Sequence, residues 1–296
     1  MDDLNTRLLV DLLRDRVRPN RSLGQHFLID DTVISRSVDI ASRASPLDTN
    51  SHVLEIGPGP GSLTLALLRT GARVTAFEVD DESVDHLQRV FGDAGGHLDL
   101  QKADALEATW PTDVTHIVAN LPYQISSPVL ERIQRHHAEH PMAVVVLLLQ
   151  EEFADRMAIG RDGAALSPLG LSLWLDFEVE LDVKVSPHSF SPSPGVSSRL
   201  TSMRPVDREP RIDRRMFRTI TKHCFANRRR KLRTLLSKPP SRIGRIKGWH
   251  KQRWSEAFDT AIKVSPEGLP EGWMDLRPEN LKTSQWVSLV DAISSN

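Results

Sequence analysis

The stretch Asn120-Leu121-Pro122-Tyr123 combines residue types that could act together on an amine of a planar base. The amide of Asn120 and the main-chain carbonyl of Leu121 can accept hydrogen bonds from an exocyclic amine, and the ring of Tyr123 can stack on the base. Accepting those hydrogens would localise a lone pair that is otherwise delocalised into the ring. The chemistry indicated is a transfer to nitrogen in which positioning does most of the work.

The position of this tetrapeptide agrees with its chemistry. It follows the apolar run 114–119, which is typical of a buried strand. In open α/β sheets, ligands bind at the carboxyl ends of the strands. Asn-Pro clusters also occur in plain turns. The functional interpretation of this motif therefore depends on the motifs that precede it in the chain.

A glycine-rich turn lies between an expected strand over His52–Ile56 and an expected helix over Ser62–Arg69. Its glycines, at positions 57, 59 and 61, permit positive φ and let a ligand approach the backbone closely. Two other interpretations stay open from these residues alone. One is a tight turn without a ligand; the other is a dinucleotide fold, whose G-x-G-x-x-G pattern would need glycine where Ser62 stands.

Two acidic residues at successive strand ends favour a nucleoside ligand. Glu78 ends the expected strand Arg73–Glu78, where a carboxylate can accept both hydroxyls of a ribose. Asp104 follows the next strand, where it can accept an adenine amino proton. Each alone would be explained by a solvated loop or a helix cap. Together with Glu55, which is expected to organise the glycine loop or the methionine amino group, they form the pattern of S-adenosylmethionine methyltransferases.

Strands and helices alternate through the first half of the chain, which predicts an α/β fold with a mostly parallel, doubly wound Rossmann-like sheet. An amphipathic helix over 4–17, with Leu8, Leu9, Leu12, Leu13 and Val17 as its apolar positions, and a second helix over 31–44 precede the alternation. We expect two more strands within 169–185. Later helices are expected over 214–225, 228–236 and 283–293.

The chain of 296 residues is long for one domain, and its composition changes near residue 206. We expect a methyltransferase domain over 1–206, with a helical extension over 1–50, and a small helical domain over 207–296. The segment 228–253 holds many Lys and Arg and no Asp or Glu, although the net charge is only -1. A basic block of this kind predicts a polyanionic partner.

The remaining composition excludes several classes of protein. One cysteine, Cys224, excludes an internal disulfide and argues against a cysteine metal site. The histidines are scattered, so no metal site is expected. The longest apolar run, 143–149, is too short to span a bilayer, and the acidic N-terminus lacks a signal-peptide pattern. We expect a cytoplasmic protein without membrane contact.

Several ordered motifs together resemble the KsgA-type rRNA adenine dimethyltransferases, from about Leu23 to Leu236. The motifs that carry the resemblance are Leu23–Leu28, Val53–Gly61, Glu78, Asp104, Asn120–Pro128, Phe190–Ser198 and Phe225–Leu232. The resemblance implies S-adenosylmethionine as cofactor and transfer of two methyl groups to N6 of each of two adjacent adenosines. It places these in a hairpin near the 3′ end of small-subunit rRNA, within a pre-30S particle. A monomer is expected.

The resemblance also implies roles for individual residues. Those implied to bind the cofactor are His26, Leu28, Gly57, Glu78, Asp104 and Asn120. Asn120 and the Leu121 carbonyl would hold the reacting amine, and Tyr123 and Phe190 would enclose the target adenine, although core packing is the alternative for Phe190. The basic block, with Trp249 and Trp254 interleaved, would dock on rRNA phosphates.

The chain departs from the family pattern at two places, and two rival functions stay open. His26 stands where bacterial members commonly carry Asn, and Leu166–Gly170 replaces a common Tyr-Gly-x-Leu-Ser stretch. The first rival is an Erm-type large-subunit rRNA methyltransferase; those enzymes usually carry Ile at the position of Leu121. The second is a non-catalytic rRNA-binding assembly factor, which would not require the set Glu78, Asp104 and Asn120.

Overall fold

The computed structural model describes residues 3–16, 24–92, 94–159, 166–208, 212–264 and 266–295. Within them the chain forms two compact units. The first comprises Met1–Asp155 and Glu178–Pro205, and the second Arg156–Phe177 and Val206–Asn296. Residues 156–177 therefore group with the second unit, and the expected domain boundary near residue 206 stays a proposal. Val17 and Leu23, named in the expectations above, lie outside the described residues.

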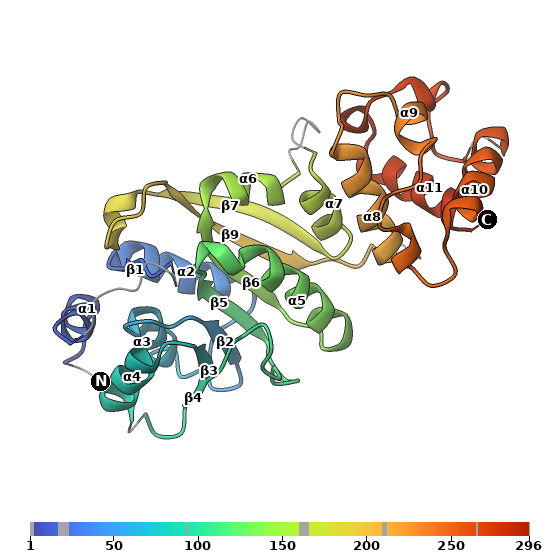
Figure 1. Ribbon diagram of the computed structural model, residues 1–296. Helices are drawn as coiled ribbons and strands as arrows, with labels where there is room; N and C mark the ends of the chain where they lie inside the picture. Colours follow the sequence, from blue (N-terminus) through green and yellow to red (C-terminus); the bar gives the residue numbers. More distant parts are fainter. Residues whose placement is uncertain are drawn as a thin grey trace. The chain divides into compact units, whose positions relative to one another are not determined.

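A seven-stranded sheet in the order β4-β3-β2-β5-β6-β9-β7 forms the centre of the first unit (Figure 1). The strands are β2 (His52–Ile56), β3 (Arg73–Glu78), β4 (Leu98–Lys102), β5 (His116–Asn120), β6 (Val144–Gln150), β7 (Phe177–Val185) and β9 (Ser198–Pro205). Strands β4, β3, β2, β5 and β6 pair in parallel, and β9 pairs antiparallel with β6. The expected doubly wound, mostly parallel fold is confirmed.

Local sequence explains where the first helices begin. The helices of this unit are α1 (Thr6–Arg14), α2 (Asp31–Ala44), α3 (Ser62–Leu68), α4 (Asp81–Phe91), α5 (Ser126–Glu139) and most of α6 (Glu151–Met157), whose last two residues belong to the second unit. Asp30 caps α2 by accepting from the Thr32 N–H, and Asp80 caps α4 by accepting from Ser83. Helix α3 follows Gly61, whose φ of 86° is left-handed.

Only some of the apolar positions expected for the first helix face the core. In α1, Leu9 and Leu13 are buried, but Leu8 and Leu12 are 39% and 37% exposed. Val10 takes part in the buried face instead, so the apolar stripe is turned relative to the expected one. A short leucine-rich helix has more apolar residues than its buried face holds, and the pattern alone cannot say which of them face the core.

The expectation of two strands within 169–185 is also wrong in its first half. Pro168–Trp174 forms helix α7, capped by the Ser167 hydroxyl and started by a proline at its first turn. Only Phe177–Val185 is a strand. Strand β9 was not expected, because Ser198–Pro205 shows no clean alternation of apolar and polar residues.

The second unit is helical and has its own apolar core. It contains α7, α8 (Arg214–Phe225), α9 (Leu232–Leu236), α10 (Lys251–Val264) and α11 (Thr283–Ser294). Trp254 and Trp286 are fully buried in this core. The helix expected over 228–236 is limited to α9, and α10 was not expected.

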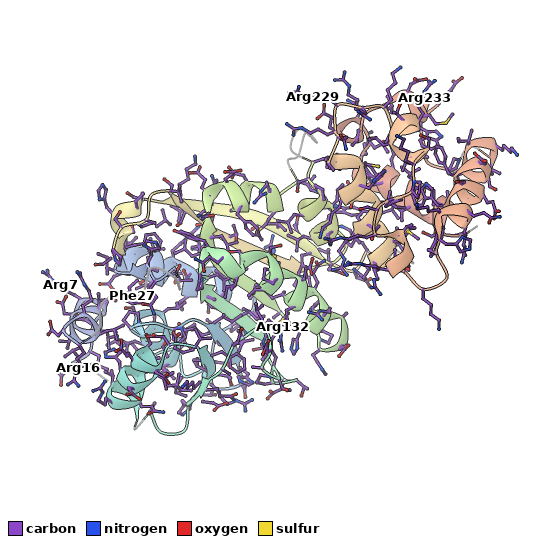
Figure 2. All side chains as sticks on the ribbon, viewed as in Figure 1. Arg7, Arg16, Phe27, Arg132, Arg229 and Arg233 are labelled. Atoms are coloured by element: carbon purple, nitrogen blue, oxygen red, sulfur yellow. The ribbon has the colours of Figure 1, made fainter. Side chains whose placement is uncertain are left out.

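The basic block of the second unit differs from its expected form in two respects. Trp249 and Trp254 are buried in the core of this unit, and the guanidinium of the partly exposed Arg253 lies over the Trp249 ring, 4.6 Å from its centroid. Asp275, which lies outside the block in sequence, forms ion pairs with Lys231 and Arg233. The side chains of residues 228–230 are exposed, and none forms an ion pair with any described residue. Figure 2 shows Arg229 and Arg233 on this unit.

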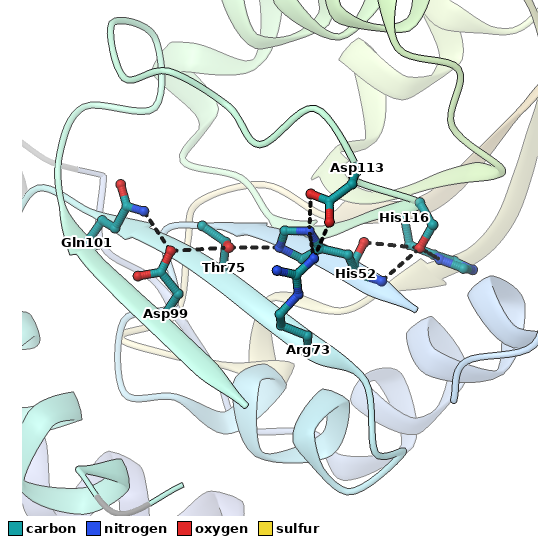
Figure 3. A network of polar contacts seen from close by, with 8 residues as sticks. His52, Arg73, Thr75, Asp99, Gln101, Asp113 and His116 are labelled. Carbon is teal, nitrogen blue, oxygen red and sulfur yellow. Dashed lines mark hydrogen bonds and ion pairs between the residues drawn. The ribbon is translucent and has the colours of Figure 1, made fainter. Parts of the chain in front are cut away.

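A polar network lies at the amino ends of β2 and β3 (Figure 3). The ring of His52 contacts Asp113 through Nδ1 at 2.9 Å and Thr75 through Nε2 at 2.8 Å. Arg73 forms a second contact to the Asp113 carboxylate. This network fixes the loop before β5 to the neighbouring strands. None of the described helices is long and apolar enough to cross a membrane.

Candidate active site

A cavity of about 400 Å³ opens at the carboxyl ends of the parallel strands. Every residue that the sequence predicted for the site lines it. These are His26, Leu28, Gly57, Glu78, Asp104, Asn120, Leu121, Tyr123 and Phe190. They come together because the loops after β2, β3, β4 and β5 all leave the same edge of the sheet. The roles expected for them stay proposals.

The glycine turn after β2 forms the floor of the cavity and is bonded to the next strand. Gly57 donates its N–H to the carbonyl of Phe77 at 2.9 Å. Gly59 has a φ of 54°, and an added Cβ there would lie 3.2 Å from the ring of Phe27. Both the backbone conformation and the close approach of Phe27 therefore favour glycine at position 59.

Glu78 is buried and bonded mostly to backbone. One carboxylate oxygen accepts the Gly59 N–H at 3.1 Å, and the other accepts from Val79 and Asp80 at 2.8 and 3.0 Å. Burial raises the pKa of Glu78, and these three hydrogen bonds oppose that shift. The carboxylate thereby connects the glycine turn to the end of β3.

Glu55 and Ser62 are two buried polar groups on the wall of the same cavity. Burial raises the pKa of Glu55 to about 8, against a hydrogen bond of 2.7 Å donated by the Thr64 hydroxyl. The hydroxyl oxygen of Ser62 is buried and has no hydrogen-bond partner among the described residues. An orphaned polar atom of this kind fits a cavity built for a polar ligand.

Asp104 begins the loop after β4, where its side chain is exposed and lines the cavity. One carboxylate oxygen accepts the N–H of Leu106 at 2.8 Å. Its main-chain carbonyl accepts from Glu107 and Ala108. These bonds close a turn that holds the carboxylate at the strand end.

Asn120 is the last residue of β5, and its side-chain nitrogen donates to the His26 carbonyl at 3.3 Å. The side-chain oxygen is then the group of Asn120 that can accept a hydrogen from an amine. The N–H of Leu121 donates to Leu148 on β6 at 3.3 Å. The motif is thus anchored on both sides before the short helix η2 (Tyr123–Ile125) begins.

Tyr123 is held by neighbours on two sides. Its hydroxyl is 2.9 Å from the Ser198 hydroxyl, and its ring stacks on His26 with 5.9 Å between centroids. Burial raises the pKa of Tyr123, opposed by the bond to Ser198. His26 itself donates from Nδ1 to the Pro192 carbonyl at 2.7 Å, since a carbonyl oxygen can only accept.

Phe190 belongs to both the cavity wall and the core. It is 4% exposed and lies on strand β8 (Phe190–Ser191), which pairs antiparallel with β1 (Phe27–Leu28). This pairing joins the N-terminal motif to the loop 187–195. Phe190 therefore packs in the core and lines the cavity at the same time.

Sequence reasoning missed three residues of the site. Phe27 packs under the glycine turn, Ser198 orients Tyr123, and Ser62 brings an unpartnered hydroxyl. Phe27 and Ser198 lie inside the motifs 23–28 and 190–198, so their motif membership was the available signal. Nothing in the sequence distinguishes Ser62 from an ordinary first residue of a helix.

A mostly parallel sheet with this strand order, a glycine turn and acids at successive strand ends defines an S-adenosylmethionine-dependent methyltransferase of the Rossmann-like class. The sequence pattern of the family described as ribosomal RNA adenine dimethylase matches residues 16–244. The chain belongs to this family, and the resemblance expected from its motifs is confirmed. S-adenosylmethionine is accordingly its cofactor, and the polar groups of the cavity fit it.

Individual relatives agree with this assignment. The chain is 34% identical over 281 residues to the probable ribosomal RNA small subunit methyltransferase A of Methanopyrus kandleri, with 94% of each chain covered. It is 31% identical to the ribosomal RNA small subunit methyltransferase A of Lactobacillus helveticus, covering 96% of this chain and 94% of the relative.

Solved structures share the fold. A dimethyladenosine transferase from Plasmodium falciparum superposes with a TM-score of 0.71 at 22% identity, covering 88% of this chain and 94% of the other. The 23S rRNA methyltransferase ErmE superposes with a TM-score of 0.60 at 26% identity, covering 90% and 99%. The fold alone therefore does not identify the RNA on which a protein of this shape acts.

Proposed function

We propose that this protein methylates N6 of two adjacent adenosines in the 3′-terminal hairpin of small-subunit rRNA, giving N6,N6-dimethyladenosine. The observation that carries the proposal is the meeting of Asn120, Leu121 and Tyr123 with Glu78 and Asp104 around one cavity. The names of the curated relatives support the small-subunit substrate.

Bound S-adenosylmethionine supplies an electrophilic methyl group on a sulfonium, a good leaving group. Asn120 and the Leu121 carbonyl accept the N6 hydrogens and direct the nitrogen lone pair at that methyl. Glu78 and Asp104, among the residues that line the cavity, would hold the cofactor, which would supply the methyl group to N6 and leave as S-adenosylhomocysteine. The proton of the resulting ammonium passes to water, so no strong base is needed.

Tyr123 and Phe190 receive the target base once it leaves its stack. Unstacking costs a few kcal/mol, and aromatic stacking of about 1–3 kcal/mol per base offsets part of that cost. The bond between the Tyr123 and Ser198 hydroxyls fixes the ring before the base arrives. We also propose that the partner is a pre-30S particle, that the basic side chains of 228–230 contact its phosphates, and that the enzyme acts in the cytoplasm as a monomer.

The two rival functions are separated by one transfer assay. Undermethylated 30S particles and 50S particles are incubated in parallel with labelled S-adenosylmethionine and the full-length protein. The proposal predicts label in 30S rRNA only. Label in 50S rRNA would support the large-subunit rival, and binding of 30S without label would support the assembly factor.

The role of the amide is tested with Asn120→Ala. We expect turnover on 30S particles to fall by roughly 10²- to 10³-fold, as for removal of a group that acts on the transition state. Cofactor affinity, measured with S-adenosylhomocysteine, should change far less. Equal losses in affinity and turnover would contradict the role given to this side chain.

A further inference from the structure

Arg132, on α5, contacts the loop that carries Asp104. Its two terminal guanidinium nitrogens donate to the main-chain carbonyls of Leu106 and Ala108. The same group lies over the ring of Trp110, 4.9 Å from the centroid. Figure 2 labels Arg132 on its helix. Nothing in the proposed chemistry uses this residue, and it does not line the cavity.

The carbonyls that Arg132 binds belong to the turn that orients Asp104. The N–H of Leu106 donates to the Asp104 carboxylate, and the N–H of Ala108 donates to the Asp104 carbonyl. Leu106 and Ala108 therefore bind Asp104 through their N–H groups and bind Arg132 through their carbonyl groups. The far end of the loop is closed by Trp110, buried and bonded from Nε1 to the Ala105 carbonyl at 2.9 Å.

Helix α5 gives Arg132 a fixed relation to the other side of the cavity. The helix begins at Ser126, directly after η2 and the motif Asn120–Tyr123. Its inner face, including Val129 and Ile133, is fully buried. The planar guanidinium donates to the two carbonyls from two separate nitrogens and presents a flat face to the indole, a geometry that the single nitrogen of an ammonium group does not offer.

We propose that Arg132 is a positioning residue that ties the Asp104 loop, on the adenine side of the cofactor site, to the helix that follows the amine-binding motif. Arg132 fixes the position of the Asp104 carboxylate near the carboxyl end of β4, and does not itself contact a ligand. This inference rests on the proposed placement of the cofactor, and it extends to a residue outside the cavity.

The test is a pair of double-mutant cycles read by the Kd of S-adenosylhomocysteine with the full-length protein. Arg132→Met should raise this Kd roughly tenfold, because a loop without its tether no longer presents Asp104. Asp104→Ala should raise it similarly. The double variant should be little weaker than either single variant, because both remove the same interaction.

A second cycle with Glu78→Gln gives the specificity control, since the Glu78 carboxylate accepts its hydrogen bonds from Gly59, Val79 and Asp80 and not from the loop that carries Asp104. In this cycle, the factor by which the double variant raises the Kd of S-adenosylhomocysteine should equal the product of the factors for Arg132→Met and Glu78→Gln. Arg135→Met, one turn further along α5 on an exposed side chain, should leave the Kd unchanged.

Three results would overturn the inference: multiplicative effects in the Asp104 cycle, equal coupling in both cycles, or no change in Kd for Arg132→Met. If Arg132→Met does not fold, Arg132→Lys keeps the charge without the two-carbonyl geometry, and the same cycles are run with it. Since no RNA is present, the result is independent of whether small-subunit rRNA is the substrate.

Discussion

The site of Glu55 favours the protonated form of its carboxyl, because burial removes the side chain from water. Burial raises its pKa to about 8, while Thr64 donates to one oxygen and the nearby charge of Glu78 adds to the shift. A neutral Glu55 lowers the negative charge in a cavity that also contains Glu78. A cationic amino group arriving there would favour its ionisation.

Glu55→Gln tests this state through stability against pH without ligand. Between an unfolded pKa near 4.5 and a folded pKa of about 8, the folded wild type retains a proton that the unfolded chain has released, so its stability falls as pH rises. Melting curves should show wild type losing stability relative to the variant from pH 5 to pH 9. A constant difference across that range would contradict the neutral carboxyl.

Residues of the site could be predicted where the sequence shows that they lie at the end of a strand. Glu78, Asp104 and Asn120 each end or closely follow an expected strand, and parallel pairing brings such strand ends together. Ser198 could not be assigned, because its role depends on β9 lying beside β6 and reaching Tyr123 from distant sequence. A pairing of that kind leaves no local pattern.

At the scale of elements, α2 and α8 were predicted with the bounds that the structure shows. Asp30 accepts the N–H of Thr32 at the start of α2, which explains why this helix begins at Asp31. The secondary structure of the segment 168–185 was harder to predict, because a short apolar run that becomes buried has the same sequence pattern in a helix and in a strand. Its helix is decided by Ser167 and Pro168, which cap and start α7.

The Asp113 network is an element-scale device that fixes the loop before β5. Burial, the largest single effect, raises the pKa of Asp113, but hydrogen bonds and charges from His52 and Arg73 together outweigh it and lower the pKa. A lowered carboxyl pKa contributes stability above the unfolded value of 3.8, and this contribution disappears as pH falls through the folded value.

Asp113→Asn should therefore lower the melting temperature at pH 6 and have progressively less effect as the pH falls below about 4. The effect should be modest, about 0.2–1 kcal/mol, because the side chain is 60% exposed and screened by solvent. Asp259→Asn, on the exposed face of α10, is the control. A deficit that persists at pH 3 would rule out the charge as its cause.

At the scale of the molecule, the second unit combines a core rich in tryptophan with exposed arginines. Sequence alone placed Trp249 and Trp254 on a nucleic-acid surface, because a charge run does not reveal which neighbouring side chains are buried. The fold also supplies Asp275 to Lys231 and Arg233, which leaves residues 228–230 as the more available cations.

The double substitution of Arg229 and Arg230 to Gln should weaken rRNA binding at all sequences by a similar factor. It should also reduce the slope of log K against log salt concentration by about 1 for each phosphate that the variant no longer neutralises. Arg7→Gln on α1 makes the same kind of charge change elsewhere and should leave the slope unaltered. An unchanged slope in the double variant would assign phosphate binding to other residues.

Methylation of the small-subunit hairpin is tested most directly by nucleoside mass spectrometry of rRNA from undermethylated 30S particles after incubation with S-adenosylmethionine and this protein. We expect N6,N6-dimethyladenosine at two adjacent positions of the 3′ hairpin, and far less of it with Asn120→Ala after the same incubation time. Absence of dimethyladenosine with the wild-type protein, although it binds S-adenosylhomocysteine, would contradict the proposed function.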